Sequence, residues 1–327
     1  MNIGFIIYDS RSGSTFLSKQ LHEFDNLFVT AESAFISRIL DSKIVHTKNV
    51  SPELIVDFLY KEIHFIELKI DKNILLLEIK NLINDGKLTN KSLIKIIIDL
   101  QLTTTKDINW ILIKHPLFEH LDTMSRMFQE CKFIHLVRDP RGVHNSKRKS
   151  INLNGDVFSN NALKTSLKYR YKVKKVLDFE INNKEQVLNI RYCDLMLKNK
   201  ETLEKCLGFL GVSNSKNNTK KYFKEIGINQ RHLHTNVESN AIESKIYSWK
   251  KELPKMDIQI ISYYCKDIIA HFNFEKIKIN PYKLSVKSAK LHIVYILTSV
   301  KNFSKIIVSN PELVASKFRY LKTFVKR

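Results

Sequence analysis

The chain has 327 residues, and its 54 lysines and arginines outnumber its 33 acidic residues, giving a formal net charge of +21. A hydrophobic content of 43% indicates a globular protein with ample core and excludes a disordered acidic or polar chain. Without an uncharged apolar run of about 18 residues, and with a strand pattern at the N-terminus, we expect neither a transmembrane helix nor a leader. The four cysteines occur singly, which favours reduced thiols over a disulfide or zinc framework.

The positive charge is concentrated near the C-terminus, where residues 276–327 contain twelve lysines and arginines and one acidic residue. Such an excess favours anionic partners, namely phosphorylated cofactors, acidic glycans, anionic lipids or nucleic acids. The alternative is a solvated lysine-rich surface that has no partner. Charge alone therefore does not assign the function.

Five short apolar runs have the composition of buried strands. They are Ile3–Tyr8, Leu27–Ala31, Trp110–Lys114, Lys132–Arg138 and Val187–Tyr192. Helical or loop stretches separate them, which is typical of βαβ units. The sequence therefore predicts an α/β fold with a mostly parallel sheet over residues 1–280.

Residues 48–108, between the second and third runs, have the pattern of a helical insert. The helices expected there run from the Ser51-Pro52 cap to about Leu68, over about Ile74–Ile83, and over about Lys91–Leu100. Insertions at the carboxyl ends of strands commonly shape a substrate pocket, and we assign that role to this one. Further helices are expected at 160–180, 200–210 and 255–272.

The first run is followed by the loop Asp9-Ser10-Arg11-Ser12-Gly13-Ser14-Thr15 and then by a helix. A strand–loop–helix turn of this composition exposes successive backbone N–H groups and a helix N-terminus, which together bind phosphate. The loop lacks the nucleotide triphosphatase pattern, because Tyr8 replaces its first glycine and Ser14 replaces its lysine. The cation is instead Arg11. A plain serine-rich helix cap is the alternative interpretation.

A second motif, Arg138-Asp139-Pro140-Arg141-Gly142-Val143-His144-Asn145-Ser146, follows the fourth run. Asp139 and Pro140 have the form of a helix cap and first helical position. Arg138 supplies a bidentate fork for a phosphate, and Ser146 a hydroxyl about two helical turns later. Alternatively, Arg138 pairs with Asp139. Two such loops at the ends of parallel strands predict a ligand with two separated phosphate groups.

These segments resemble the PAPS-dependent sulfotransferases, which use 3′-phosphoadenosine-5′-phosphosulfate (PAPS). RSGSTFL is similar to the family's loop for the 5′-phosphosulfate, and VRDPRGVHNS to its 3′-phosphate motif. The segments IRYCDLM, FLGV and YSWKKEL resemble downstream elements in the same order, so the likeness covers roughly residues 1–280. Asp9-Ser10 and Cys193 depart from the pattern. The resemblance implies a P-loop-like three-layer fold, PAPS as cofactor, adenosine 3′,5′-bisphosphate as product, and no metal.

The resemblance also assigns roles to individual residues. Glu32, after the second run, is similar to the base of carbohydrate- and protein-tyrosine-type members, while His115 is the rival because small-molecule members use a histidine near a K-x-H string. Arg11 and Lys114 are the expected stabilisers of charge in the transition state. The predicted cofactor-binding residues are Arg11, Ser12, Gly13, Ser14, Thr15, Arg138 and Ser146, followed by the weaker candidates Arg191 and Trp249.

The predicted function is sulfuryl transfer to a hydroxyl of a carbohydrate or glycolipid. A small-molecule P-loop kinase is the enzyme alternative, disfavoured because Ser14 replaces the lysine that would reach the transferred phosphate. A basic membrane- or nucleic-acid-binding protein is the non-enzyme alternative, although no nucleic-acid module is recognisable and no nucleic acid is expected. We expect a cytoplasmic protein.

The basic tail, residues 281–327, lies outside the resemblance and has the pattern of amphipathic helices at Leu291–Val300 and Phe318–Val325. Three interpretations remain open: the tail docks on the core, pairs two copies in a homo-oligomer, or rests on an anionic membrane surface at the inner face of the membrane.

Overall fold

The computed structural model describes residues 1–47, 49–102, 108–151, 157–215 and 245–280. The predictions made for the tail fall on residues 281–327 and therefore lie outside the described residues. The chain divides into two compact units. The first is formed by Met1–Glu32 and Thr105–Ser288, and the second contains Ser33–Thr104.

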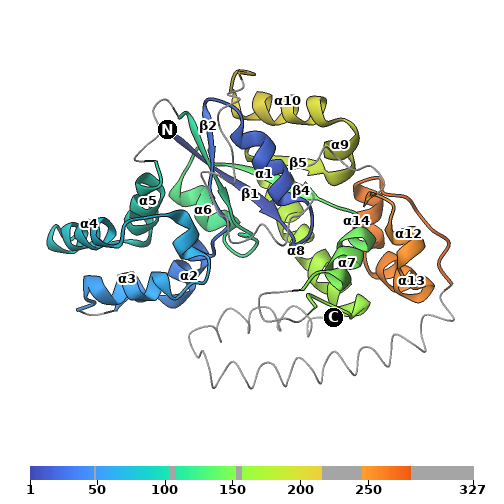
Figure 1. Ribbon diagram of the computed structural model, residues 1–327, viewed down its shortest axis with the longest axis horizontal. Helices are drawn as coiled ribbons and strands as arrows, with labels where there is room; N and C mark the ends of the chain where they lie inside the picture. The colour runs from blue at the N-terminus through green and yellow to red at the C-terminus, as the bar shows by residue number, and fades with distance from the viewer. Residues whose placement is uncertain (48, 103–107, 152–156, 216–244, 281–327) are drawn as a thin grey trace. The chain divides into compact units, whose positions relative to one another are not determined.

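The first unit is built on a five-stranded sheet of order β2-β3-β1-β4-β5, in which all strand pairings are parallel (Figure 1). The strands are β1 (Asn2–Tyr8), β2 (Leu27–Val29), β3 (Trp110–Lys114), β4 (Lys132–Val137) and β5 (Val187–Arg191). The predicted mostly parallel sheet is thus confirmed. Strand β2 ends before the predicted Ala31, because the Thr30 hydroxyl accepts the hydrogen bond of the Lys114 main-chain N–H and the chain leaves the ladder there.

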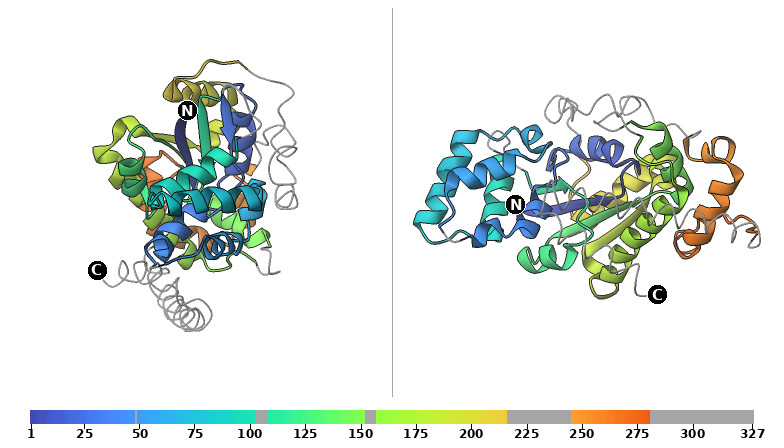
Figure 2. Two further views of the ribbon diagram at one scale, coloured as in Figure 1. Left: turned by 90° about the vertical axis from the view of Figure 1, so that its left-hand side faces the viewer. Right: turned by 90° about the horizontal axis from the view of Figure 1, so that it is seen from below.

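Helices cover both faces of this sheet, with α1 on one face and α6 and α8 on the other (Figure 2, right). Their bounds are α1 (Ser14–His22), α6 (Leu121–Met127), α7 (Pro140–Lys149), α8 (Ala162–Asn182), α9 (Tyr192–Leu197), α10 (Asn199–Leu210), α12 (Trp249–Glu252), α13 (Lys255–Tyr264) and α14 (Lys266–His271), with a 3-10 turn η3 (Lys184–Gln186). The helix predicted at 255–272 is divided into α13 and α14 at Cys265. The parallel sheet between helical layers is the predicted three-layer α/β fold.

The second unit is helical. It contains α2 (Phe35–Ser42), α3 (Pro52–Tyr60), α4 (Lys72–Asn84) and α5 (Asn90–Leu100), with 3-10 turns η1 (Ile44–His46) and η2 (Phe65–Leu68). Ser51 caps α3 as predicted, but the extension of that helix to Leu68 is wrong. The Glu62 carboxylate accepts hydrogen bonds from the His64 N–H and the Ser33 hydroxyl, and these bonds stabilise a turn where the helix would have continued.

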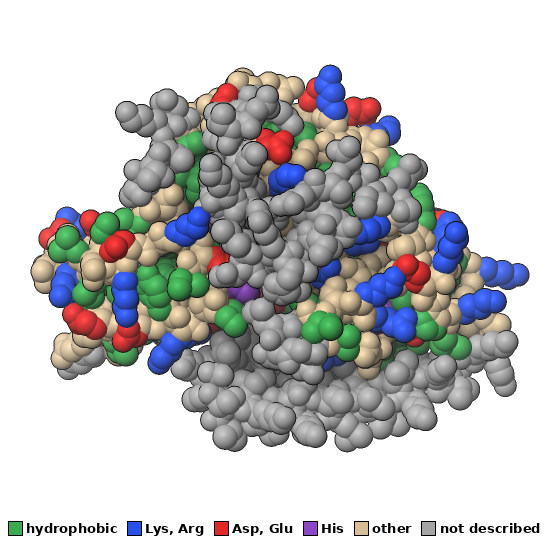
Figure 3. All heavy atoms as spheres, viewed as in Figure 1, with side chains coloured by type: hydrophobic (Ala, Val, Ile, Leu, Met, Phe, Trp, Pro, Cys, Tyr) green, Lys and Arg blue, Asp and Glu red, His purple; other side chains and the backbone are tan. Residues whose placement is uncertain are grey.

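The surface of the second unit carries exposed apolar side chains, visible as green spheres over its helices in Figure 3. They include Leu54 on α3 and Leu77 on α4, each about half exposed. Among the described residues, no helix has the length and apolar character needed to cross a membrane.

Candidate active site

The loop after β1 is folded as a tight cradle at the N-terminus of α1. Its backbone enters the left-handed region at Arg11 (φ 70°) and at Gly13 (φ 94°), and the Ser12 N–H donates to the Asp9 carbonyl oxygen. A Cβ atom on Gly13 would lie 2.6 Å from ring atoms of Tyr192. Glycine is required here both by its backbone angle and by the close approach of the aromatic ring. The loop thus makes a tight turn that leads directly into the N-terminus of α1, an arrangement typical of phosphate-binding loops.

The second loop begins directly after β4. Asp139 caps α7 by accepting the Arg141 N–H at 2.9 Å, and it also accepts two hydrogen bonds from the Arg141 guanidinium at 2.8 and 2.6 Å. Asp139 is thus bound by Arg141 rather than by Arg138, against the alternative interpretation of the motif. The Arg138 guanidinium lies over the ring of Tyr192, 4.3 Å from its centroid.

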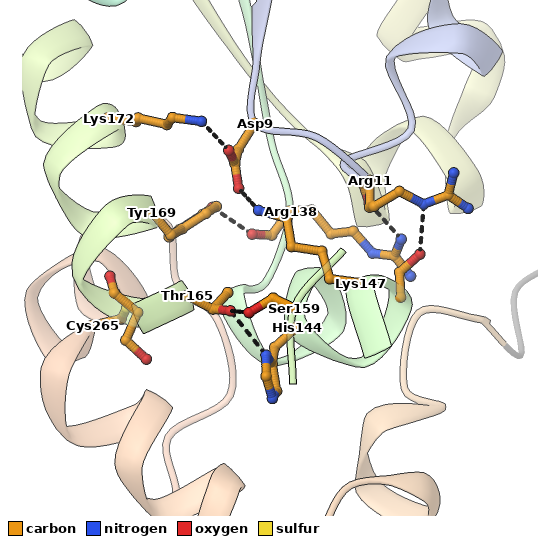
Figure 4. Close-up of polar contacts among 12 residues, drawn as sticks. Asp9, Arg11, Arg138, His144, Lys147, Ser159, Thr165, Tyr169, Lys172 and Cys265 are labelled. Carbon is orange, nitrogen blue, oxygen red and sulfur yellow. Dashed lines mark hydrogen bonds and ion pairs between the residues drawn. The ribbon is translucent and has the colours of Figure 1, made fainter. Parts of the chain in front are cut away.

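The two loops contact each other (Figure 4). The Arg11 Nε donates to the Ser146 hydroxyl of α7 at 3.2 Å, and one Arg138 nitrogen donates to the Arg11 carbonyl oxygen at 2.9 Å. A second Arg138 nitrogen donates to the carbonyl oxygen of Lys245 at 3.2 Å. The structure therefore brings together Arg11, Gly13, Arg138 and Ser146, which the sequence assigned to one cofactor. We call Arg11, Arg138 and Lys245, with the loop Ser12–Thr15 and Ser146, the cation cradle.

Charge in the cation cradle is strongly positive. Burial lowers the pKa of Arg138, and burial together with the charge of Arg138 lowers the pKa of Arg11. Burial, followed by the charges of Arg138 and Arg11, lowers the pKa of Lys245. Cations whose pKa is lowered by burial and by neighbouring cations are stabilised when an anion binds among them. Lys245 was not predicted, since its own position carries no motif; the nearby YSWKKEL segment was the one available signal.

The cradle fits a ligand with phosphate groups. The Nε of Arg138 and the hydroxyl of Ser12 are buried, and neither has a hydrogen-bond partner among the residues that the structure describes. Leaving such groups unpaired costs free energy, so both favour a ligand that accepts their hydrogen bonds. The 5′ end of an adenosine bisphosphate suits the Ser12–Thr15 loop, and its 3′-phosphate suits Arg138 and Ser146.

A second group of site residues lies at the ends of β2 and β3. The buried Lys114 ammonium donates to the Thr15 hydroxyl at 2.9 Å and pairs with the Glu32 carboxylate at 3.2 Å. The Glu32 side chain is 34% exposed, whereas His115 is 1% exposed and its main-chain N–H donates to the Ile6 carbonyl oxygen. We call Glu32 and Lys114 the carboxylate–lysine pair. Through Thr15, this pair is joined to the cation cradle.

The two weaker cofactor candidates make contacts outside the cradle. The Arg191 guanidinium binds both oxygens of Asp194 at 2.7 Å and donates to the Phe272 carbonyl oxygen. The Trp249 ring is buried beneath Arg141, whose guanidinium lies 3.9 Å from the ring centroid. Both side chains thus hold the segment after residue 245 against α7 and β5. Within the described ranges, no group of three or more His, Cys, Asp or Glu residues could hold a metal ion.

Comparison with known proteins shows the family of this chain. The model of the sulfotransferase family matches residues 5–216, so the chain belongs to the sulfotransferase family. This confirms the resemblance to PAPS-dependent sulfotransferases that the motifs indicate. No match is found among curated protein sequences.

Solved structures show the same fold. The sulfotransferase domain from the curacin biosynthetic pathway is 20% identical, with a TM-score of 0.57 over 84% of this chain and 99% of that one. The sulfotransferase domain from the Synechococcus PCC 7002 olefin synthase is 17% identical, with a TM-score of 0.53 over 81% of this chain and 94% of that one.

Proposed function

We propose that the protein transfers the sulfuryl group of PAPS to an acceptor hydroxyl, with Glu32 as general base. The observation that carries this proposal is the chain of contacts from Glu32 through Lys114 to Thr15, which ties a partly exposed carboxylate to the phosphate loop. PAPS, when bound, supplies the sulfuryl group and leaves as adenosine 3′,5′-bisphosphate. The residues of the protein then have to remove the proton of the acceptor and stabilise the negative charge of the leaving group.

Each residue of the site has a distinct task. Backbone N–H groups of the Ser12–Thr15 loop and the Arg11 guanidinium hold the 5′ end of the ligand. Arg138, Ser146 and Lys245 hold the 3′-phosphate. Lys114 lies between loop and base, where an ammonium group stabilises negative charge that grows on the bridging oxygen.

Exposure favours Glu32 over His115 as the base. A general base must come within hydrogen-bond reach of the hydroxyl proton that it removes. Glu32 is 34% exposed and can be reached by an acceptor, whereas His115 is almost fully buried beside β1. We assign His115 a structural role at the end of β3.

The first acceptor class to test is the hydroxyl of a carbohydrate or glycolipid, because a carboxylate base is the feature shared with the carbohydrate-type members that the sequence resembles. Phenols, fatty alcohols and tyrosine peptides complete the panel. Transfer is measured with PAPS that carries radioactive sulfur, separating labelled products by chromatography. The acceptor found in this panel then serves all kinetic tests.

Two matched variants test the base. We expect Glu32→Gln to lower kcat about 100-fold or more, the usual contribution of a general base, and to leave the affinity for adenosine 3′,5′-bisphosphate unchanged. His115→Gln is the control and should lower kcat less than about tenfold. A large loss in His115→Gln together with a small loss in Glu32→Gln would reverse the assignment. Failure of the native chain to use PAPS with any acceptor, or to bind it, would contradict the proposed function itself.

A further inference from the structure

One buried ion-pair cluster beside the cation cradle is not used by the mechanism above. Asp9, the first residue after β1, is 3% exposed and lies between two lysines (Figure 4). One of its carboxylate oxygens accepts a hydrogen bond from Lys147 on α7, and the other accepts one from Lys172 on α8 at 2.6 Å. A single side chain thus connects the phosphate loop to two helices.

These contacts join the same segments that carry the two ends of the cradle. Asp9 is two residues from Arg11, and Lys147 directly follows Ser146, so the Asp9–Lys147 pair runs beside the Arg11–Ser146 hydrogen bond. Helix α8 completes the arrangement, because Tyr169, one turn before Lys172, donates its hydroxyl hydrogen bond to the Arg138 carbonyl oxygen. The ends of β1 and β4 are therefore fastened to each other and to one common helix.

The charges of the cluster oppose its opening. Burial alone would raise the pKa of Asp9, but the charges and hydrogen bonds of Lys147 and Lys172 lower it well below its usual value. Burial lowers the pKa of Lys147, and Asp9 opposes that change. Separating the ions would leave a buried charge without a partner, which is strongly unfavourable. The spacing between the two loops is thus held by ion pairs that cannot easily open.

From this geometry we infer that Asp9 is a positioning residue that sets the separation between the two phosphate-binding ends of the cradle. This inference rests on the proposed function. A ligand with two phosphates gains affinity from both ends of the cradle only if the spacing between the ends is fixed. Once its first phosphate is bound, binding of the second phosphate is then an intramolecular step. A ligand with one phosphate does not depend on that spacing. Asp9 should therefore affect the affinity for the bisphosphate, and not the affinity for a monophosphate that binds at one end.

The test compares three ligands by calorimetric titration: adenosine 3′,5′-bisphosphate, 5′-AMP and 3′-AMP. The double variant Asp9→Asn/Lys147→Met removes both charges of the more deeply buried pair, and Lys172→Met removes the partly exposed partner alone. Lys174→Met is the matched control, because Lys174 is a lysine of the same helix whose ion pair, at 3.5 Å, is with Asp267. Circular dichroism and thermal unfolding check that each variant folds. If the double variant does not fold, the titration of Lys172→Met decides between the outcomes.

We expect the double variant to bind the bisphosphate about 10- to 100-fold more weakly, while its affinity for each monophosphate changes less than about threefold. Lys172→Met should also bind the bisphosphate more weakly, by about three- to tenfold, with little change for the monophosphates. Lys174→Met should show no change in affinity for any of the three ligands. Equal losses for all three ligands, or no loss, would overturn the positioning role and leave the proposed function intact. A native chain that does not prefer the bisphosphate would overturn both.

Discussion

The cation cradle and the carboxylate–lysine pair lie at the carboxyl ends of the same parallel sheet, but their charges are arranged in opposite ways. In the cradle, burial lowers the pKa of Arg138, while burial and neighbouring cations lower the pKa of Arg11 and of Lys245. Two nitrogens of Arg138 donate to main-chain oxygens. In the pair, one ammonium lies against one carboxylate at 3.2 Å. The first arrangement suits a bound anion, whereas the second holds a carboxylate in the ionised form that can accept a proton from the acceptor.

This difference also separates binding from chemistry. Substitutions in the cation cradle should weaken binding of adenosine 3′,5′-bisphosphate. Substitutions in the carboxylate–lysine pair should slow sulfuryl transfer more than they weaken binding of this ligand.

The largest expected effect belongs to Lys114, which joins the two regions. Lys114→Met removes the contact to Glu32 and the one to Thr15, and with them an ammonium group beside the reacting atoms. We expect kcat to fall about 100- to 1000-fold, the usual cost of one charge-stabilising donor. Affinity for adenosine 3′,5′-bisphosphate, measured on the same preparation, should fall much less than kcat, because Arg11 and Arg138 still bind the phosphates of this ligand. An equal loss of binding and turnover would show that the two regions are not separable.

Acid should act on the fold through His135, in the strand that leads to Arg138. Burial lowers the pKa of His135 from 6.5 to about 4, against the hydrogen bond with Asn189. The unfolded chain takes up this proton below about pH 6.5, while the folded chain excludes it until about pH 4, so stability is lost as the pH falls through that window. The loss amounts to about 3 kcal/mol in the free energy of unfolding.

Urea unfolding across that pH window measures this loss, and His135→Gln is the comparison because it removes the titrating group. We expect the variant to lose less stability on acidification than the native chain. An identical pH dependence in both proteins would assign acid sensitivity to other groups. The comparison also separates acid effects on the fold from acid effects on a carboxylate base.

A smaller effect tests the shape of the cradle. Gly13→Ala and Gly211→Ala both place a methyl group at a positive φ, 94° and 67°, but the new Cβ meets Tyr192 only at Gly13. Each change should cost about 1 kcal/mol for the left-handed backbone, and Gly13→Ala should cost about 1 to 3 kcal/mol more because of the overlap with the ring. Thermal and urea unfolding measure the difference. Equal costs would mean that Tyr192 does not define the loop.

The sheet could be predicted because its buried strands are short apolar runs, and β3 matches the predicted range at both ends. The predicted cofactor residues of the two motifs come together because the carboxyl ends of parallel strands share one edge. The helix through Leu68 was predicted wrongly because its apolar pattern continues past Tyr60. Only the contact between Glu62 and Ser33, distant in sequence, shows why the chain turns.

Other features depend on contacts that local patterns do not contain. Lys245 joins the cradle through its carbonyl oxygen and its charge, 107 residues away from Arg138 in sequence. Asp9 was noted as a departure from the family pattern, but its partners Lys147 and Lys172 lie on helices that only the fold places beside it. The motifs can be recognised in the sequence, whereas tertiary packing determines which charged side chains lie beside them.

We propose that the cation cradle binds both phosphates of adenosine 3′,5′-bisphosphate at the same time. Calorimetric titration of the native chain and of Arg138→Met with the bisphosphate and with 5′-AMP tests it most directly. We predict that the native chain strongly prefers the bisphosphate, and that Arg138→Met loses about 10- to 100-fold in affinity for it, the value of hydrogen bonds to a charged group, with little change for 5′-AMP. Equal affinity of the native chain for both ligands, or an unchanged bisphosphate affinity in Arg138→Met, would contradict the account.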